Sequence, residues 1–250
     1  MQIKNFAKFV NLARSRGPFV AAKRVFTYLS PSEFKQRAIY RNMLRLQSSR
    51  ERFNEIYSKN LWSDPESGSG SGSNLAATES LRTALPRIFE KYDIRRVLDV
   101  PCGDFNWMRL VIEGNQNLYY TGGDIVGSLI IDNNARYASE RVNFLEIDLT
   151  NDELPSADLL IVRDCLFHLS FSDILKAKRN ISRSNIRYLL TTTHIVENDF
   201  QNKDIITGDF RLIDIFSLPL SFPEDPLERI TDYVGSEPPR EMCLFEVGRL

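Results

Sequence analysis

The sequence predicts an α/β protein with a doubly wound, mostly parallel seven-stranded sheet and a helical arm at its amino terminus. From Arg95 onward, short apolar runs alternate with helical or loop segments, which is typical of strands joined by crossover helices. The charge also changes sign along the chain. Residues 1–60 hold 13 Lys and Arg against 3 Asp and Glu, whereas residues 61–250 hold 19 against 30. We therefore expect a basic helical arm over residues 1–60 and one α/β domain over residues 61–250.

The arm shows three helical patterns. Apolar side chains recur at helical spacing over residues 3–13 and 19–28, and Gly17-Pro18 separates the two segments. Ser30 then supplies an N-cap before a proline, which predicts a third helix to about Ser58. A basic arm beside an acidic domain can dock on an anionic partner such as lipid head groups, nucleic acid or an acidic glycan. A solvated helical face explains the same charges equally well.

A serine- and glycine-rich stretch follows the arm at residues 66–73. Its composition is that of a flexible linker. Alternatively, it forms a loop that brings backbone amides and hydroxyls close to a ligand, because a helix predicted over residues 75–90 connects it directly to the first strand. Composition alone leaves both interpretations open.

Seven apolar runs predict the strands. We expect the first five to be parallel and the last two, separated by residues 235–239, to form a closing antiparallel pair. The runs cover residues 97–100, 118–122, 142–147, 158–162, 188–192, 229–234 and 242–247.

Composition excludes several classes of protein. The chain is 42% hydrophobic and 26% charged, and no apolar run approaches the roughly 18 residues of a membrane span. Lys4, Lys8 and Arg14 interrupt the first apolar residues, so a secretory signal is not expected and we predict a cytoplasmic protein, with the arm as a route to peripheral membrane contact. Three widely spaced cysteines and two histidines fit neither a disulfide framework nor a metal site.

Acidic residues stand at the ends of three predicted strands. Asp99 ends the first and precedes a turn at residues 101–104, Asp124 ends the second, and Asp148 ends the third. The carboxyl ends of parallel strands share one edge of a sheet, where doubly wound folds bind ligands. A carboxylate at the end of the second strand is placed to accept hydrogen bonds from both hydroxyls of a ribose.

This pattern resembles that of the class I S-adenosylmethionine-dependent methyltransferases, whose first motif reads D-x-G-x-G-x-G. Asp99 and Gly103 match it, whereas Pro101 and Phe105 occupy the positions of the first and third glycines. The resemblance implies that the methionine part of the cofactor S-adenosyl-L-methionine lies on this turn, and that the third strand end binds adenine. The cofactor-binding residues that it implies are Asp99, Pro101, Cys102, Gly103, Asp124, Ile125, Asp148, Leu149 and Arg163.

Residues 62–250 also resemble a narrower, poorly characterised family of bacterial and plant-type methyltransferases. The motifs that carry this resemblance are the serine-glycine stretch at 68–73, Pro-Cys-Gly-Asp-Phe-Asn-Trp at 101–107 and Thr-Gly-Asp-Phe-Arg at 207–211. The resemblance favours an ordered role for the serine-glycine stretch. Neither the G-x-G-x-x-G of a dinucleotide-binding dehydrogenase nor a phosphate-binding P-loop occurs.

Methyl transfer to a hydroxyl requires a base, for which the sequence offers few candidates. We expect His194, at the end of the fifth strand, to be that base, with His168 and Asp164 beyond the fourth strand in support. Either histidine is equally explained as a buried side chain that supports a loop. Asp209 and Arg211 fit either a polar acceptor site or a structural ion pair.

We therefore expect O-methylation of a small-molecule or glycan acceptor. An RNA or protein methyltransferase that docks through the basic arm is the second hypothesis, although the fourth strand lacks the Asp/Asn-Pro-Pro-Tyr/Phe motif of base-methylating enzymes. A non-catalytic interaction protein that keeps the fold is the third. The intact acidic strand ends count against it.

Overall fold

The computed structural model describes residues 38–62, 64–233 and 239–250, in two compact units, Met1–Arg45 and Leu46–Leu250. In the first unit, residues 38–43 are helical. The helices expected over residues 3–13 and 19–28, the start of the third helix and most of the basic arm's charges lie outside the described residues.

The long helix predicted to end at Ser58 is interrupted. Residues 44–48 form turns and bends, and α4 (Ser49–Ser58) begins separately. A capping box starts it, because the Ser48 side chain accepts a hydrogen bond from the Glu51 amide and the Glu51 carboxylate accepts one from the Ser48 amide. Since the second unit begins at Leu46, α4 belongs with the sheet, and the expected boundary at residue 60 falls after it.

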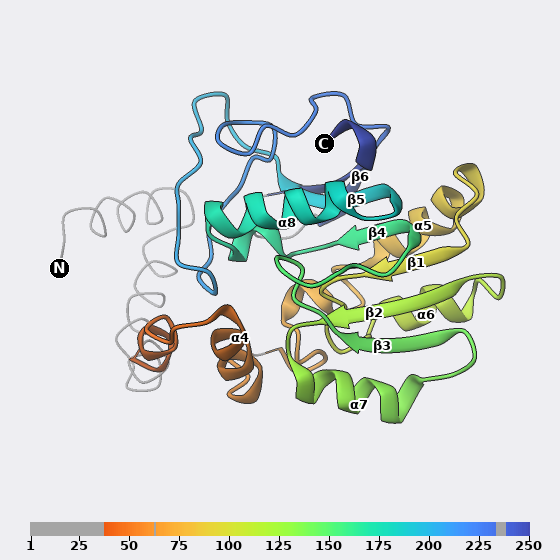
Figure 1. The fold of residues 1–250 in the computed structure, drawn as a ribbon, viewed down its shortest axis with the longest axis horizontal. Coiled ribbons are helices and arrows are strands. Elements are labelled where there is room, and N and C mark those ends of the chain that lie inside the picture. Colours follow the sequence, from red (N-terminus) through yellow and green to blue (C-terminus); the bar gives the residue numbers. More distant parts are fainter. Residues whose placement is uncertain (1–37, 63, 234–238) are drawn as a thin grey trace, which may run out of the picture. The chain divides into compact units, whose positions relative to one another are not determined.

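The second unit contains one seven-stranded sheet in the order β3-β2-β1-β4-β5-β7-β6 (Figure 1). All seven predicted strands are confirmed, and β7 runs antiparallel to β5 and β6 while the other pairs are parallel. The strands are β1 (Arg96–Asp99), β2 (Tyr119–Asp124), β3 (Val142–Glu146), β4 (Ala157–Val162), β5 (Ile186–His194), β6 (Glu228–Tyr233) and β7 (Arg240–Glu246).

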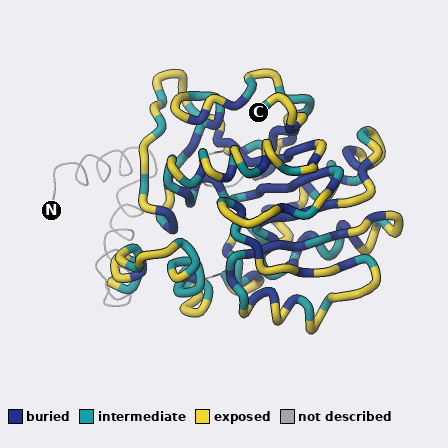
Figure 2. Tube along the Cα trace, in the orientation of Figure 1, coloured by how far each residue is buried: buried dark blue, intermediate teal, exposed yellow. Residues whose placement is uncertain are grey.

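Helices cover both faces of the sheet, which explains why its central strands are apolar throughout. Residues 159–162 of β4 are completely buried, and the strand interiors form the buried centre of Figure 2. The side chains of α5 (Glu79–Lys91) and α6 (Met108–Glu113) pack in one hydrophobic cluster, and those of α8 (Phe171–Arg183) pack in the other. The remaining helix, α7 (Gly127–Tyr137), lies beside β2 and β3 (Figure 1).

A long connection, residues 195–227, links β5 to β6 without a helix or strand. Apolar side chains fix it to the cluster around α8, among them Ile213, Ile215 and Phe222, each at most 4% exposed. This connection carries the Thr-Gly-Asp-Phe-Arg segment towards the carboxyl edge of the sheet. Among the described residues, no helix is both long and apolar enough to cross a bilayer.

Candidate cofactor and acceptor site

A cavity of about 400 Å³ lies at the carboxyl edge of the sheet. Its size is typical of sites that enclose small molecules. The strands and loops bring together in its lining every predicted cofactor-binding residue and every candidate base, whereas Asp209 and Arg211 are not part of it: the lining includes Asp99, Pro101, Cys102, Gly103, Asp124, Ile125, Asp148, Leu149, Arg163, Asp164, His168 and His194.

The turn after β1 uses left-handed backbone at two positions. Gly103 has φ +54°, and a Cβ on it would collide with the Ser69 hydroxyl. Phe105, where the related motif carries a glycine, also has a positive φ of 58°. Its ring packs against Tyr120 and Phe144 at centroid distances of 4.9 and 5.1 Å, and these contacts offset the cost of a backbone conformation that glycine adopts freely.

Asp99, the last residue of β1, is buried directly before this turn. Its carboxyl is 2% exposed and accepts a hydrogen bond of 2.9 Å from the Tyr120 hydroxyl. Burial raises the pKa of Asp99 to about 7, against the opposing effects of Tyr120 and the positive charge of Arg163. The carboxyl is therefore poised to hold a proton near neutral pH.

Asp124 ends β2 in a position that fits a ribose. Its two oxygens accept hydrogen bonds from the backbone amides of Gly103, at 3.2 Å, and Val126, at 3.1 Å. These bonds fix the carboxylate and leave each oxygen with capacity for a ligand hydroxyl. Burial raises the pKa of Asp124 to about 6, so the group is mainly ionised at pH 7.

Asp148 follows β3 and is oriented by its own turn. One oxygen accepts from the amide and hydroxyl of Thr150, at 2.9 and 2.7 Å, and the other accepts from the Asn151 side chain at 2.8 Å. Buried Leu149 lies beside it in the cavity wall. This edge thus combines an oriented hydrogen-bond acceptor with an apolar surface, as an adenine site requires.

The serine-glycine stretch is an ordered wall of the cavity and not a linker. The Asp104 carboxylate accepts hydrogen bonds from the Ser67 hydroxyl, at 3.0 Å, and the Gly68 amide, at 2.9 Å. In return, the Ser69 hydroxyl accepts from the Asp104 amide at 2.9 Å. The loop therefore closes onto the turn after β1, beside the place where the methionine part of the cofactor is expected.

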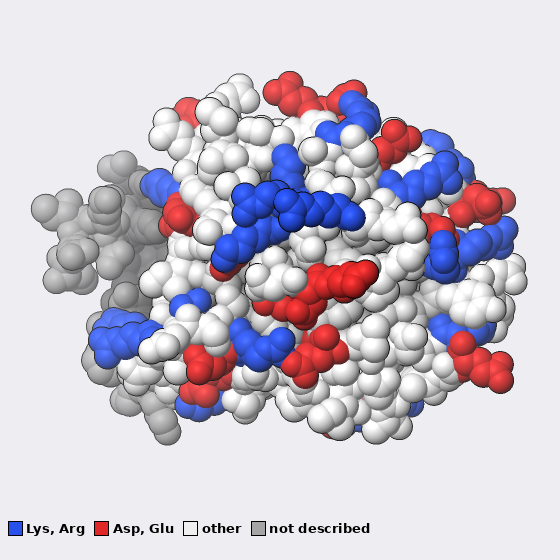
Figure 3. Space-filling view, in the orientation of Figure 1, with Lys and Arg blue, Asp and Glu red and all other residues white. Residues whose placement is uncertain are grey.

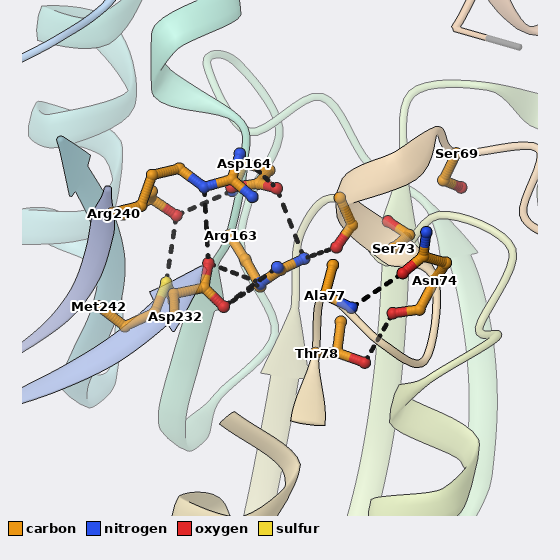
Figure 4. Close-up of polar contacts among 12 residues, drawn as sticks. Ser69, Ser73, Asn74, Ala77, Thr78, Arg163, Asp164, Asp232, Arg240 and Met242 are labelled. Atoms are coloured by element: carbon orange, nitrogen blue, oxygen red, sulfur yellow. Dashed lines mark hydrogen bonds and ion pairs between the residues drawn. The ribbon is translucent and has the colours of Figure 1, made fainter. Parts of the chain in front are cut away.

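Four charged side chains hold this loop to the centre of the sheet, three of them buried and that of Asp164 partly buried (Figure 4). The Arg163 guanidinium lies 3.1 Å from both oxygens of Asp232, and Arg163 also donates to the Gly72 carbonyl at 2.8 Å. Asp164 lies 3.3 Å from Arg240 and 3.5 Å from Arg163. Two cations and two anions thus compensate one another in the protein interior.

Sequence reasoning found neither Asp232 nor Arg240, because both lie on the last two strands, remote from every recognised motif. Pairing of β5 with β7 places Arg240 opposite His194, and this register brings a terminal strand into the site. Both strands contain other charged residues, so nothing in the local sequence singled out Asp232 or Arg240.

Aromatic rings dominate the other end of the cavity. The rings of His168 and His194 lie 4.6 and 5.2 Å from that of Phe167, and Trp62 lies 5.3 Å from His168. Phe210, which is 49% exposed, lies 5.8 Å from His168. Neither Trp62 nor Phe210 shows a periodic sequence signal, since both are in irregular segments.

The two histidines face different hydrogen-bond partners. His194 Nδ1 accepts a bond of 3.2 Å from the Ile213 amide, so a neutral His194 carries its proton on Nε2. Burial, together with the positive charge of Arg240, lowers the pKa of His194 to about 4. A protonated Nε2 donates, and this arrangement is unfavourable for the base role expected of His194.

His168 has the reverse arrangement. Its Nδ1 lies 2.8 Å from the backbone carbonyl of Asp209, which only accepts, so Nδ1 carries the proton and Nε2 keeps its lone pair. Burial lowers the pKa of His168, so the ring is neutral at pH 7. Asp209 thus contacts His168 through its backbone carbonyl. Nearby Arg211 donates to the Phe167 carbonyl at 3.2 Å.

No family model matches this sequence, and no curated protein matches it either. Solved structures are similar in fold. The mitomycin 7-O-methyltransferase MmcR has a TM-score of 0.55 and 16% identity, with 88% of this chain and 69% of that chain covered. Human N-acetylserotonin methyltransferase, in complex with SAM, has a TM-score of 0.52 and 14% identity, with 88% and 68% covered.

The methyltransferase domain of bacterial CtHen1 has a TM-score of 0.51 and 14% identity, covering 69% of this chain and 100% of that domain. These likenesses are likenesses of fold, and in this chain the fold is the seven-stranded sheet with β7 antiparallel. The chain therefore has the Rossmann-like fold of the class I S-adenosylmethionine-dependent methyltransferases.

Proposed function

We propose that this protein is an S-adenosylmethionine-dependent methyltransferase that methylates a hydroxyl of a small-molecule or glycan acceptor. One observation carries the proposal: a single cavity runs from the strand ends of Asp124 and Asp148 to the imidazoles of His168 and His194. A cofactor site and a proton-transfer site thus share one cavity.

The residues at the first end fit the cofactor. Asp124 presents two fixed oxygens suited to a ribose diol, and Gly103 leaves space that a Cβ would fill. Asp148 and Leu149 offer an acceptor and an apolar surface for adenine. Two proteins of similar fold are described with SAM or SAH, namely human N-acetylserotonin methyltransferase and PigF.

When bound, S-adenosylmethionine supplies a methyl group on a sulfonium, and its C–S bond breaks, with the electron pair left on sulfur, as the new O–C bond forms. The chain's own residues orient the acceptor and take up its proton. The buried thiols are unsuited to act as nucleophiles, because burial raises the pKa of Cys102 and of Cys165.

The second end of the cavity favours a ring-shaped acceptor. Phe53 and Trp62 line it with Phe210, whose exposed ring is available to cover a bound molecule. Aromatic faces stack on planar rings and on the apolar faces of sugars. On the face drawn in Figure 3, a band of basic side chains lies next to a group of acidic ones, so charges of both signs adjoin on this surface.

A transfer assay with S-adenosylmethionine labelled in its methyl group tests this function. Phenols, hydroxylated sugars and a short RNA are offered as acceptors, and Asp124→Ala serves as the negative control. We expect label in the phenol or sugar products, at a rate that falls with the control. Label in RNA alone, or equal incorporation by the control, would contradict the proposal.

A further inference from the structure

The two histidines of the cavity both pack against Phe167, but their Nδ1 atoms have opposite hydrogen-bonding roles. His168 Nδ1 donates to a carbonyl, whereas His194 Nδ1 accepts from an amide. Among the described residues, none forms a hydrogen bond with either Nε2 atom. These two Nε2 atoms are therefore the groups that remain for a ligand.

We propose that His168 Nε2 is the proton acceptor of this site, and that His194 Nε2–H is a donor that holds the acceptor's oxygen. The inference rests on the proposed function, and it moves the base role from the fifth strand to the loop after the fourth. In the transfer step, the acceptor hydroxyl gives its proton to His168 Nε2 as the O–C bond forms. The resulting imidazolium keeps its bond from Nδ1–H to the Asp209 carbonyl.

Residues 207–211 hold His168 in this orientation. The Gly208 amide donates to the His168 carbonyl at 2.7 Å. Thr207 joins the same loop to α8, since its hydroxyl accepts from the Ser170 amide at 2.9 Å and donates to Asp173 at 2.6 Å. The Thr-Gly-Asp-Phe-Arg segment thus receives a physical role, because its backbone fixes the tautomer of the base.

Charged groups around His168 also suit this role. Burial lowers its pKa and the Asp209 carbonyl opposes that effect; Asp164 raises the pKa, while Arg211 and Arg240 lower it. The His168 ring therefore stays neutral at pH values at which an ordinary histidine begins to take up a proton. Transfer that depends on His168 should stay pH-independent from neutrality down to below pH ~6.5 and fall only when the ring is protonated.

Nitrogen NMR of the full chain tests the assignment without an acceptor. The sequence holds two histidines, so long-range ¹H–¹⁵N spectra at pH 7 contain two imidazole patterns. We expect one Nδ1–H and one Nε2–H tautomer, assigned to His168 and His194 by loss of each pattern in His168→Asn and His194→Asn. An Nε2–H or cationic His168 would overturn the proposal.

The two asparagine variants are a matched pair. In His168→Asn the amide NH₂ replaces the Nδ1–H donor to Asp209, and in His194→Asn the amide oxygen replaces the Nδ1 acceptor. Each variant therefore keeps its structural hydrogen bond and loses only Nε2. Circular dichroism and titration with S-adenosylhomocysteine should match the wild type in both, which separates this proposal from cofactor binding.

Acylation by diethyl pyrocarbonate then measures which Nε2 has a free lone pair. We expect mass spectrometry to find His168 modified in the wild type and in His194→Asn, with His194 unmodified throughout.

With any acceptor that the wild type methylates, His168→Asn should lose about 10²–10⁴-fold in turnover, and His194→Asn about tenfold. Preferential acylation of His194, or the reverse order of turnover, would overturn the assignment. If the wild type does not bind S-adenosylhomocysteine, the proposed function itself is refuted.

Discussion

The two ends of the cavity are built in different ways. The cofactor end takes its carboxylates from β1, β2 and β3, which follow one another in the chain and lie side by side in the sheet. The acceptor end draws on α4, the long connection before β6, and β7. The positions of side chains at the carboxyl ends of neighbouring strands thus form the cofactor end. Ion pairs and hydrogen bonds between segments far apart in the sequence form the acceptor end. Each of the following changes tests that difference.

The largest expected effect comes from the buried ion pairs at the acceptor end. Asp232→Asn leaves Arg163 without its closest counter-charge, and we expect a loss of about 3–5 kcal/mol in the free energy of unfolding. Urea unfolding measures it. Asp225→Asn breaks an exposed pair with Arg249 and should change little. Equal losses in the two variants would show that the buried cluster does not stabilise the fold.

The cofactor end should depend on Asp124. Asp124→Ala leaves a ribose without its charged acceptor, and we expect a loss of about 1.5–3 kcal/mol in S-adenosylmethionine binding. Calorimetry compares it with Asp132→Ala, a change to an exposed residue of α7. Unchanged affinity in a folded Asp124→Ala protein would remove Asp124 from the ribose site.

The serine-glycine loop connects the two ends and should tolerate no added bulk. A Cβ at residue 72 would come within 2.5 Å of an Asp164 oxygen, so Gly72→Ala should cost about 1–3 kcal/mol of stability by overpacking. Gly248 has open space around it, which makes Gly248→Ala the matched control. If thermal unfolding shifts equally for both, the loop is not packed against the charge cluster.

The pH dependence of stability tests the buried carboxyl at the cofactor end. Burial gives Asp99 a pKa of about 7 in the fold against the ordinary aspartate value of 3.8, so the folded state holds a proton that the unfolded state releases between these values. Its contribution to stability therefore falls as pH rises from about 4 to 7. Asp99→Asn keeps an acceptor for Tyr120 and removes the titration. Relative to the wild type, its urea midpoint should rise across this range, and a pH-independent difference would contradict the pKa.

The fold was predictable because burial on both faces makes the strands continuous apolar runs, of which residues 159–162 are the clearest. The cofactor end could be predicted because acidic residues directly follow such runs. The break in the helix predicted to end at Ser58 was missed, because Ser48 caps a new helix inside an apparently continuous pattern. The tautomers of His168 and His194 were beyond prediction, since their partners, Asp209 and Ile213, come from an irregular connection that only the tertiary fold positions.

The proposed function requires that this cavity bind a methyl-transfer cofactor. Isothermal titration of the wild-type chain with S-adenosylhomocysteine tests it most directly, with NAD as the comparison ligand. We predict saturable one-to-one binding of S-adenosylhomocysteine and no binding of NAD. Binding of NAD without binding of S-adenosylhomocysteine would contradict the assignment of this cavity to a methyl-transfer cofactor.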